Sequence, residues 1–340
     1  MHNTMKKLYI CHTPYHLLIA IVKQLIEKSQ SDLVLCREEL IGDDVINRLK
    51  NHNLFDRIFS YTNLDSRSEL RKRAREVLIH RRKMNSEIEQ VLQITLQELK
   101  RYDIYIFTDC STFGYWLNMN GIKYHLLEDG LNCFKLFKYS KEYTAIERIQ
   151  KLIRQLLRID FAFWGESSNY ISIEVNDADG IQINHKEKLI EIPRRDLFHQ
   201  LSENDRNTIR DIFLGQDTVS LENGQTLSTL VITEPLSEDF VVTHEIKLKI
   251  YRYLIDTYGV GQVFIKPHPR DTDFYEDFQD CVVISQKNVP LEVLDFSKNL
   301  RFKRAITCSS TSIQDLENVE EKVFMGLEWI DQFAKGIGMI

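Results

Sequence analysis

A histidine enclosed by prolines and cations is the stretch of this sequence best suited to chemistry. Residues 266–270 read Lys-Pro-His-Pro-Arg, so His268 has a proline on either side, with Lys266 and Arg270 beyond them. The prolines restrict the backbone, and the cations favour an anion beside the ring. The pattern indicates a phosphate site where an imidazole, expected to be cationic, donates a proton or a hydrogen bond. A structural histidine is the alternative.

A loop rich in hydroxyl groups is a second candidate for binding an anion. Ser309, Ser310 and Thr311 follow the apolar run 304–308 and precede a helix expected to open at Ile313. Hydroxyls and free backbone N–H groups at a helix N-terminus bind anions well. A plain helix cap with spare serines explains the same residues, so this loop carries weight only together with His268.

Carboxylates follow two further apolar runs. They are Glu128 and Asp129 after residues 124–127, and Glu234, Glu238 and Asp239 after residues 230–233. A carboxylate at such a position serves as a general base, accepts a hydrogen bond from a sugar, or caps a turn. Asp239 and Asp129 are the two candidate bases.

The elements that position these groups form a strand, helix, strand unit over residues 230–269. Two apolar runs, 230–233 and 262–265, flank a helix predicted for residues 243–258, with apolar residues at Ile246, Ile250, Tyr253 and Leu254 and with Gly259 at its end. Such a unit gives parallel strands with a right-handed crossover, and open parallel sheets bind ligands at the carboxyl ends of their strands. The acids after one strand and His268 after the next should therefore lie close together.

The N-terminal half repeats the alternation of strands and helices. A strand is predicted at 7–11 and a helix at 14–27, so His12, Thr13, Tyr15 and His16 lie where a strand meets a helix, either as a ligand site or as a start capped by Thr13. Further strands are predicted at 33–36, 57–61, 104–108 and 124–127, and a hairpin or edge strand at 170–193. This is an α/β pattern. We expect domains at 1–197 and 198–326, with a C-terminal helix, 327–340, packing back toward the first.

Composition narrows the class of protein. The chain has 340 residues, 43% of them hydrophobic, and a net charge of −6, which argues against a dedicated nucleic-acid binder. Six dispersed cysteines, no signal peptide and no membrane-spanning run predict a cytoplasmic protein with free thiols. No metal-binding spacing, P-loop or G-x-G-x-x-G motif is present. Basic helices at 66–83 and 146–158 are either solvated faces or surfaces for anionic lipid or a polyanionic acceptor.

Together, these motifs resemble those of bacterial sialyltransferases. The residues that carry the resemblance are His12-Thr13-Pro14-Tyr15-His16-Leu17-Leu18, Glu128-Asp129-Gly130, Glu234-Pro235-Leu236-Ser237-Glu238-Asp239, Lys266-Pro267-His268-Pro269-Arg270 and Ser309-Ser310-Thr311, in this order. The most similar family is glycosyltransferase family 52, which includes lipooligosaccharide and capsule sialyltransferases. The Thr-Pro-Tyr opening and the Pro-Leu-Ser-Glu-Asp loop point to that family in particular.

The resemblance implies a GT-B fold, in which two Rossmann-like domains face a central cleft. It implies an inverting, metal-independent transfer of sialic acid from CMP-sialic acid to a terminal galactoside of a capsular polysaccharide or glycolipid, with no cofactor. His268 would act on the phosphate as acid or electrostatic stabiliser. The donor-binding residues implied are Lys266, Pro269, Arg270, Pro290, Glu292, Ser309, Ser310 and Thr311, with Pro290 and Glu292 at the ribose.

The resemblance leaves the base and the acceptor site less defined. It favours Asp239 as base over Asp129. The residues expected to bind acceptor or sugar are His12, Thr13, Tyr15, His16, Glu128, Glu234 and Glu238. Two alternatives remain: a related transferase that uses another nucleotide-activated sugar or a polyol phosphate, and a non-catalytic sugar-binding subunit of polysaccharide assembly. Homodimer formation and contact with the inner membrane surface stay open.

Overall fold

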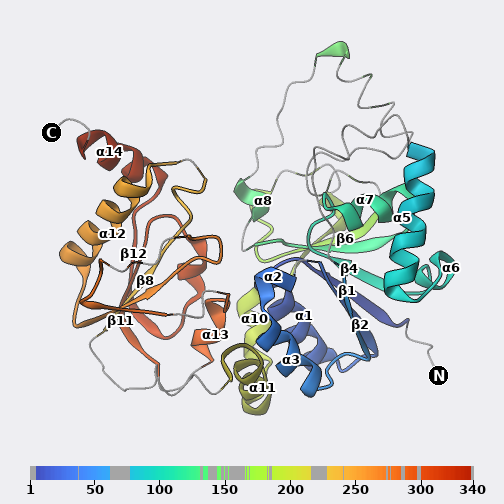
Figure 1. Cartoon of the computed structure of the whole chain (residues 1–340), viewed down its shortest axis with the longest axis horizontal. Helices are drawn as coiled ribbons and strands as arrows, with labels where there is room; N and C mark the ends of the chain where they lie inside the picture. The colour runs from blue at the N-terminus through green and yellow to red at the C-terminus, as the bar shows by residue number, and fades with distance from the viewer. Residues whose placement is uncertain are drawn as a thin grey trace. The chain divides into compact units, whose positions relative to one another are not determined.

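The chain forms two compact units in the computed structural model, residues 1–205 and 206–340. The structure describes residues 5–36, 38–61, 77–130, 133–136, 144–146, 149, 152, 165, 167, 169–181, 183, 186–215, 228–239, 241–272, 275, 277–284, 288–296 and 300–337. The basic segments predicted at 66–83 and 146–158 lie mostly outside these ranges. Figure 1 shows both units with their elements labelled.

The first unit is built on a seven-stranded sheet. Its strands are β1 (Lys7–Cys11), β2 (Ser31–Leu35), β3 (Arg57–Ser60), β4 (Asp103–Ile106), β5 (Tyr124–Leu127), β6 (Tyr170–Val175) and β7 (Leu189–Glu191). They lie in the order β3-β2-β1-β4-β5-β6-β7, and every neighbouring pair is parallel. The order reverses between β1 and β4, as in a Rossmann fold.

Helices cover both faces of the first sheet. They are α1 (Pro14–Glu27), α2 (Glu38–Ile41), α3 (Asp43–Asn51), α5 (Val77–Leu92), α6 (Leu96–Leu99), α7 (Thr112–Met119), α8 (Cys133–Leu136), η2 (Lys186–Lys188) and α10 (Arg194–His199). Figure 1 shows α1, α3 and α10 on one face and α5 and α7 on the other. Leu8 and Ile10 of β1 point toward α5 and α7, where they join a core with Ile88 and Trp116. This alternation of side chains is the period of two expected for a strand.

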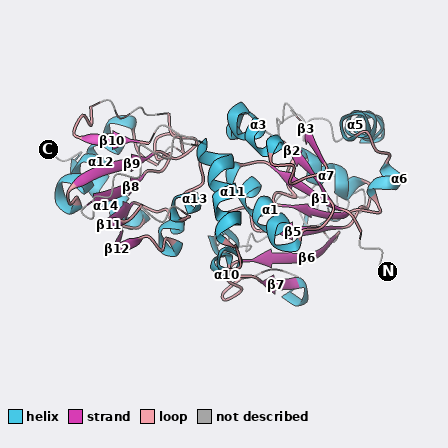
Figure 2. Ribbon diagram, turned by 90° about the horizontal axis from the view of Figure 1, so that it is seen from below, coloured by secondary structure: helices cyan, strands magenta, loops and turns pink. Residues whose placement is uncertain are grey.

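The second unit contains a smaller sheet of the same kind. Its strands β8 (Ser228–Ile232), β9 (Gln262–Lys266), β10 (Cys281–Val283), β11 (Phe302–Thr307) and β12 (Val319–Phe324) lie in the order β10-β9-β8-β11-β12. All four pairs are parallel. The helices are α12 (His244–Tyr258), α13 (Glu292–Asp295), η4 (Thr311–Asp315) and α14 (Leu327–Ile337), and α11 (Glu203–Leu214) spans the boundary between the units. Figure 2 distinguishes helices from strands by colour.

Two hydrophobic cores enclose the second sheet. Val231 and Ile265 pack with Leu254 of α12 and Ile330 of α14 on one face. Leu230 and Phe302, with Leu294 of α13, form the core of the other face. Trp329 and Phe333 of α14 also contact Tyr253 of α12. The C-terminal helix is thus anchored to its own unit, and its predicted return to the first domain stays a prediction.

The sequence located most elements within about two residues, but one interpretation was wrong. Residues 170–193 do not form a hairpin, because β6 and β7 pair in parallel. The polar turn at 176–180 instead starts a crossover, and β7 is the edge strand. The helix expected at Ile313 is a short 3-10 helix, Thr311–Asp315.

The edge strand β12 carries charge on its exposed side. Its side chains alternate between half-buried and exposed along the strand. Lys303 Nζ lies 2.7 Å from Glu320 Oε2, and Arg304 Nε lies 2.9 Å from Glu321 Oε2, so ion pairs join β12 to β11. Among the described residues, none of the helices has the length and apolar character needed to cross a membrane.

Candidate active site

The loops after β8, β9 and β11 bring the predicted phosphate-binding and acidic residues of the second unit together. These loops leave the carboxyl ends of adjacent strands, and the strand order reverses between β8 and β11. His268, in the loop after β9, accepts a hydrogen bond at Nδ1 from the backbone N–H of Arg270, at 3.1 Å. A ring nitrogen that accepts carries no proton, so the neutral imidazole holds its proton on Nε2. The side chain is therefore oriented as a hydrogen-bond donor.

The surroundings of His268 favour its neutral imidazole. Burial, together with the positive charges of Arg270 and Lys266, lowers its pKa from 6.5 to about 4. The expectation of a cationic ring concerns the phosphate-bound state and stays a prediction. A phosphate beside Nε2 would raise this pKa, because a nearby negative charge favours the protonated form.

Glu234 is fixed by the protein itself. Its Oε1 accepts hydrogen bonds from the backbone N–H groups of Ser309 and Ser310, each at 2.7 Å, and from the Thr307 hydroxyl. Its Oε2 accepts from the Tyr251 hydroxyl at 2.6 Å. The N–H groups expected to be free for an anion are thus donated to Glu234, and this carboxylate joins the exits of β8 and β11. The Ser310 hydroxyl lies 2.7 Å from that of Ser312.

Asp239, the preferred base, is held by a guanidinium group. Arg270 Nη1 and Nη2 lie 2.6 Å and 2.9 Å from its two carboxylate oxygens. The side chains of Asp239 and Arg270 are 44% and 56% exposed, so the pair contributes only about 0–1 kcal/mol to stability. A ligand anion can therefore replace Asp239 as the partner of the Arg270 guanidinium group at little energetic cost.

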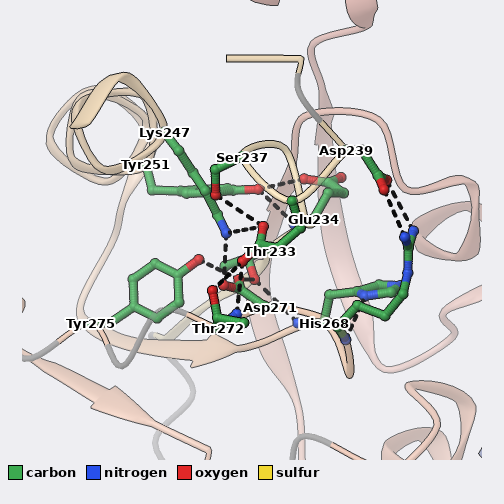
Figure 3. Close-up of polar contacts among 12 residues, drawn as sticks. Thr233, Glu234, Ser237, Asp239, Lys247, Tyr251, His268, Asp271, Thr272 and Tyr275 are labelled. Atoms are coloured by element: carbon green, nitrogen blue, oxygen red, sulfur yellow. Dashed lines mark hydrogen bonds and ion pairs between the residues drawn. The ribbon is translucent and has the colours of Figure 1, made fainter. Parts of the chain in front are cut away.

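A buried network that the sequence did not reveal ties these loops together. Lys247 Nζ on α12 lies 2.7 Å from Asp271 Oδ1 and 3.1 Å from Glu238 Oε2, and the lysine is fully buried. Glu238 also accepts from the backbone N–H of Thr272, at 2.8 Å, and from the Thr272 hydroxyl, at 2.7 Å. Burial raises the pKa of Glu238, but these hydrogen bonds outweigh it and hold the pKa well below its usual range. Figure 3 shows this network beside His268 and Asp239.

Lys266 and Glu292 are buried ionisable groups on β9 and α13. Burial lowers the pKa of Lys266 to about 7, opposed by the charge of Glu292. Burial raises the pKa of Glu292 to about 7, opposed in part by Lys266. Each group therefore changes its protonation near neutral pH. An anion that approaches Lys266 would stabilise its charged form.

In the first unit, Asp129 is held by a histidine and a threonine. Its Oδ1 accepts from His16 Nε2, at 2.8 Å, and from the Thr108 hydroxyl, at 2.7 Å. His16 Nδ1 accepts the backbone N–H of His12, which fixes the proton on Nε2. Burial raises the pKa of Asp129, but attraction to His16 and these hydrogen bonds hold it below its usual value. No described residue donates a hydrogen bond to Oδ2.

The other predicted acceptor residues of the first unit lie next to this pair in the sequence. Thr13 caps α1, as the structural alternative predicted, by accepting the N–H of His16 at 3.2 Å. Glu128 is buried, and its Oε2 accepts the backbone N–H of Asn176 at 2.8 Å. His12 and Tyr15 are half-buried at the same end of the sheet, since they follow β1.

The comparison with protein families decides the affiliation of the chain. The sequence model of glycosyltransferase family 52 matches residues 46–325. This chain belongs to glycosyltransferase family 52. The resemblance found in the short motifs is thereby confirmed.

Known proteins similar to this family 52 chain share its fold at low sequence identity. An α/β-galactoside α-2,3-sialyltransferase from the luminous marine bacterium Photobacterium phosphoreum has a TM-score of 0.58 and 12% identity, over 95% of this chain and 90% of its own. A UDP-GlcNAc 2-epimerase from Methanocaldococcus jannaschii, in complex with UDP-GlcNAc and UDP, has a TM-score of 0.51 and 12% identity, over 97% and 92%. The predicted GT-B architecture of two Rossmann-like domains is confirmed.

A closer sequence relative covers only part of the family 52 chain. An uncharacterized protein from Haemophilus influenzae is 32% identical over 127 residues, which are 37% of this chain and 41% of that protein. The chain thus matches less than half of that relative's length.

The family 52 chain distributes its predicted site residues over both units. His12, Thr13, Tyr15, His16, Glu128 and Asp129 lie in the first, and the rest lie in the second. In the second unit, Pro290 is buried, whereas Pro269 and Thr311 are half-buried. The residues missed by the sequence are Thr233, Lys247, Tyr251, Asp271 and Tyr275. One feature of the sequence could have indicated that Lys247 is buried. It lies three residues before Ile250, and residues at this spacing share one face of a helix.

Proposed function

We propose that this family 52 chain is a sialyltransferase that uses CMP-sialic acid. The observation that supports it best is His268, held in the tautomer that donates from Nε2 at the carboxyl end of β9, with Arg270 beside it. Departing CMP develops negative charge on its phosphate. A preorganised N–H donor and a guanidinium group are suited to stabilise that charge. The Ser309 and Ser310 hydroxyls, with Lys266, are the further proposed contacts, and Glu292 is proposed at the ribose.

The proposed reaction is a single displacement with inversion. The acceptor hydroxyl oxygen forms a bond to the anomeric carbon, while the bond from that carbon to the CMP phosphate oxygen breaks and its electron pair leaves with CMP. The hydroxyl proton passes to a carboxylate. The transition state resembles an oxocarbenium ion, so one base can suffice. The proposal uses no metal, because cationic and N–H groups neutralise the single phosphate.

Asp239 is the proposed base, and it can accept a proton only after its ion pair with Arg270 opens. The guanidinium group of Arg270 covers both of its oxygens, so Arg270 must turn from Asp239 to the donor phosphate before Asp239 accepts a proton. The exposed pair is weak enough for this exchange. Asp129 is the alternative base, supported by its Oδ2, to which none of the residues that the structure describes donates a hydrogen bond. Glu234 and Glu238 are poor bases because protein donors already occupy both of their carboxylate oxygens.

The proposed acceptor is a terminal galactoside of a capsular polysaccharide or lipooligosaccharide, bound through the first unit. The proposed setting is the cytoplasm, with peripheral contact at the inner membrane surface when the acceptor is a glycolipid, and a homodimer stays open. The α-2,3-sialyltransferase from Photobacterium phosphoreum supports this class of donor and acceptor by fold alone.

Release of CMP from CMP-sialic acid, in EDTA, with and without lactose, tests the proposal. We expect lactose-dependent release, and a loss of about 100-fold or more in His268→Ala. Loss in Asp239→Asn but not in Asp129→Asn assigns the base to Asp239, and the reverse result assigns it to Asp129. Asp280→Asn is the matched control, because Asp280 forms a similar exposed pair with Arg252.

Other results would redirect the proposal. Turnover of another nucleotide sugar, or of a polyol phosphate donor, with none of CMP-sialic acid would keep the transferase and change its donor. Binding of CMP without turnover on any galactoside would favour the non-catalytic sugar-binding subunit.

A further inference from the structure

The buried ion pair of Lys247 and Asp271 connects the two loops that carry the proposed catalytic groups. Lys247 lies in the first turn of α12, whereas Asp271 follows β9, and both side chains are fully buried. The same ammonium group binds Glu238 in the loop after β8. One cation from the helix therefore holds the loop of Asp239 and the loop of His268 (Figure 3).

The connection to His268 runs through its backbone. Asp271 Oδ2 accepts from the Thr233 hydroxyl at 2.6 Å, and the Thr233 oxygen accepts the backbone N–H of His268 at 3.2 Å. The Asp271 N–H donates to the His268 carbonyl at 2.9 Å. Tyr275 supplies a further hydroxyl to Asp271 at 2.6 Å. Asp271 thus fixes the peptide groups on both sides of the imidazole.

The connection to Asp239 runs through its neighbour. Glu238 accepts from Lys247, from Ser237 at 2.9 Å and from both donors of Thr272. These bonds leave Glu238 little freedom, and Asp239 follows it directly with its own N–H donated to Pro235, at 2.8 Å. The backbone that presents Asp239 is therefore set by the same network as that of His268.

Stability alone does not account for this arrangement. A buried ion pair is often no more stabilising than apolar side chains of the same volume, whereas its geometry is specific. Here the hydrogen bonds of the pair lead to His268 and to the loop of Asp239, the two groups that the proposed reaction needs. Both groups must be held within a fraction of an ångström for the reaction.

We propose that Lys247 and Asp271 are positioning residues of the active site, which set the orientation of His268 and of the Asp239 loop. This inference rests on the proposed function for its kinetic part, but the orientation of His268 is measurable without activity. The charged groups that act on the imidazole are Arg270, Lys266, Asp271 and Asp239. Removal of Lys247 should release the ring toward solvent. It also takes the ammonium partner away from Asp271, so the tautomer of His268, rather than its titration, reports the orientation of the ring.

The variants are Lys247→Met, Lys247→Arg and Asp271→Asn in the full chain. Lys249→Met is the matched control, since Lys249 lies on the same helix and pairs with Glu245 in solvent. Thermal unfolding establishes that each variant is folded. NMR of 15N-labelled imidazole groups, with the His268 signals assigned by His268→Asn, then reports the tautomer and the titration of His268.

In the unchanged protein and in Lys249→Met, we expect the Nε2–H tautomer and a titration well below pH 6.5. In folded Lys247→Met and Asp271→Asn, we expect mixed tautomers. In Lys247→Met the titration should also move toward the ordinary value, whereas in Asp271→Asn the loss of a negative charge that raises the pKa of His268 opposes that shift. Transfer should lose about 10- to 100-fold in kcat, with the donor KM changed by less than about threefold, because the groups are misplaced rather than removed. Lys247→Arg should recover part of kcat.

An unchanged tautomer, titration and kcat in a folded variant would overturn the proposal and leave the pair a purely structural role. If Lys247→Met does not fold, Asp271→Asn and Lys247→Arg carry the same test. If the unchanged protein releases no CMP, the proposed function fails, and the NMR result still decides whether Lys247 and Asp271 orient His268.

Discussion

Substitution of Glu234 would best distinguish a structural role of this carboxylate from a sugar-binding role. The sequence placed it among the sugar-binding residues, whereas in the structure it accepts hydrogen bonds from Ser309, Ser310, Thr307 and Tyr251. Replacing it by glutamine keeps the shape but removes the charge. It also turns one acceptor into a donor that faces the Tyr251 hydroxyl.

The magnitude follows from the hydrogen bonds that change. A bond to a charged acceptor contributes about 1.5–3 kcal/mol and a neutral one about 0.5–1.5 kcal/mol, so each of the three bonds to Oε1 loses about 1 kcal/mol. The mismatch at Tyr251 adds to this loss, and relief from burying a charge offsets part of it. We expect Glu234→Gln to lower the free energy of unfolding by about 3 kcal/mol, and Tm by roughly 10 °C.

The assay is thermal and urea unfolding of the full chain, together with the acceptor KM. Glu245→Gln is the control, because Glu245 is 77% exposed on α12 and a change there should stay within about 0.5 kcal/mol. A Glu234→Gln protein that melts like the unchanged one, but with the acceptor KM raised tenfold, would refute the structural role and restore the sugar-binding one.

The remaining predictions concern acid sensitivity, the guanidinium group and two glycines. Because the pKa of His268 is lowered from 6.5 to about 4, the unfolded chain takes up the proton first, so stability falls as pH falls from about 6.5 to about 4. His268→Gln should flatten this loss in urea unfolding at pH 7 and pH 5, and an equal loss in both proteins would contradict it. Arg270→Gln should lower kcat/KM for the donor about 100-fold, whereas Arg252→Gln, from the similar exposed pair, should act like the unchanged enzyme. Gly114→Ala should destabilise the first unit by about 3 kcal/mol, since the added Cβ would lie 2.2 Å from a backbone carbonyl oxygen. Gly130→Ala should not destabilise it, because a Cβ added there meets no described atom within 4 Å. Equal Tm values for the two variants would refute this difference.

The fold was predictable because its signals are local. Short apolar runs, helices capped at Thr13 and Thr243, and polar loops between them reveal a parallel α/β chain without any knowledge of distant contacts. The direction of β7 was not predictable, because alternation along a strand is the same for parallel and antiparallel pairing. The polar turn after β6 resembled a hairpin for that reason.

The candidate site was predictable in its location and only partly in its roles. Short motifs mark the loops, but the role of a carboxylate depends on the donors that reach it. Three of the donors to Glu234 lie more than 70 residues further along the chain. The buried face of α12 was shifted by one residue from the predicted one: Tyr251 is buried, while Tyr253 is 43% exposed. That shift is also why Lys247 was not recognised as a buried residue.

The charged edge of the second sheet has a consequence for association between molecules. An unpaired edge strand is a template for another strand, and aggregation commonly begins there. At β12, a strand from another molecule would have to strip water from Glu320 and Glu321 and compete with their ion pairs to Lys303 and Arg304. The ion pairs that join β12 to β11 therefore also disfavour growth of the sheet from one molecule into the next.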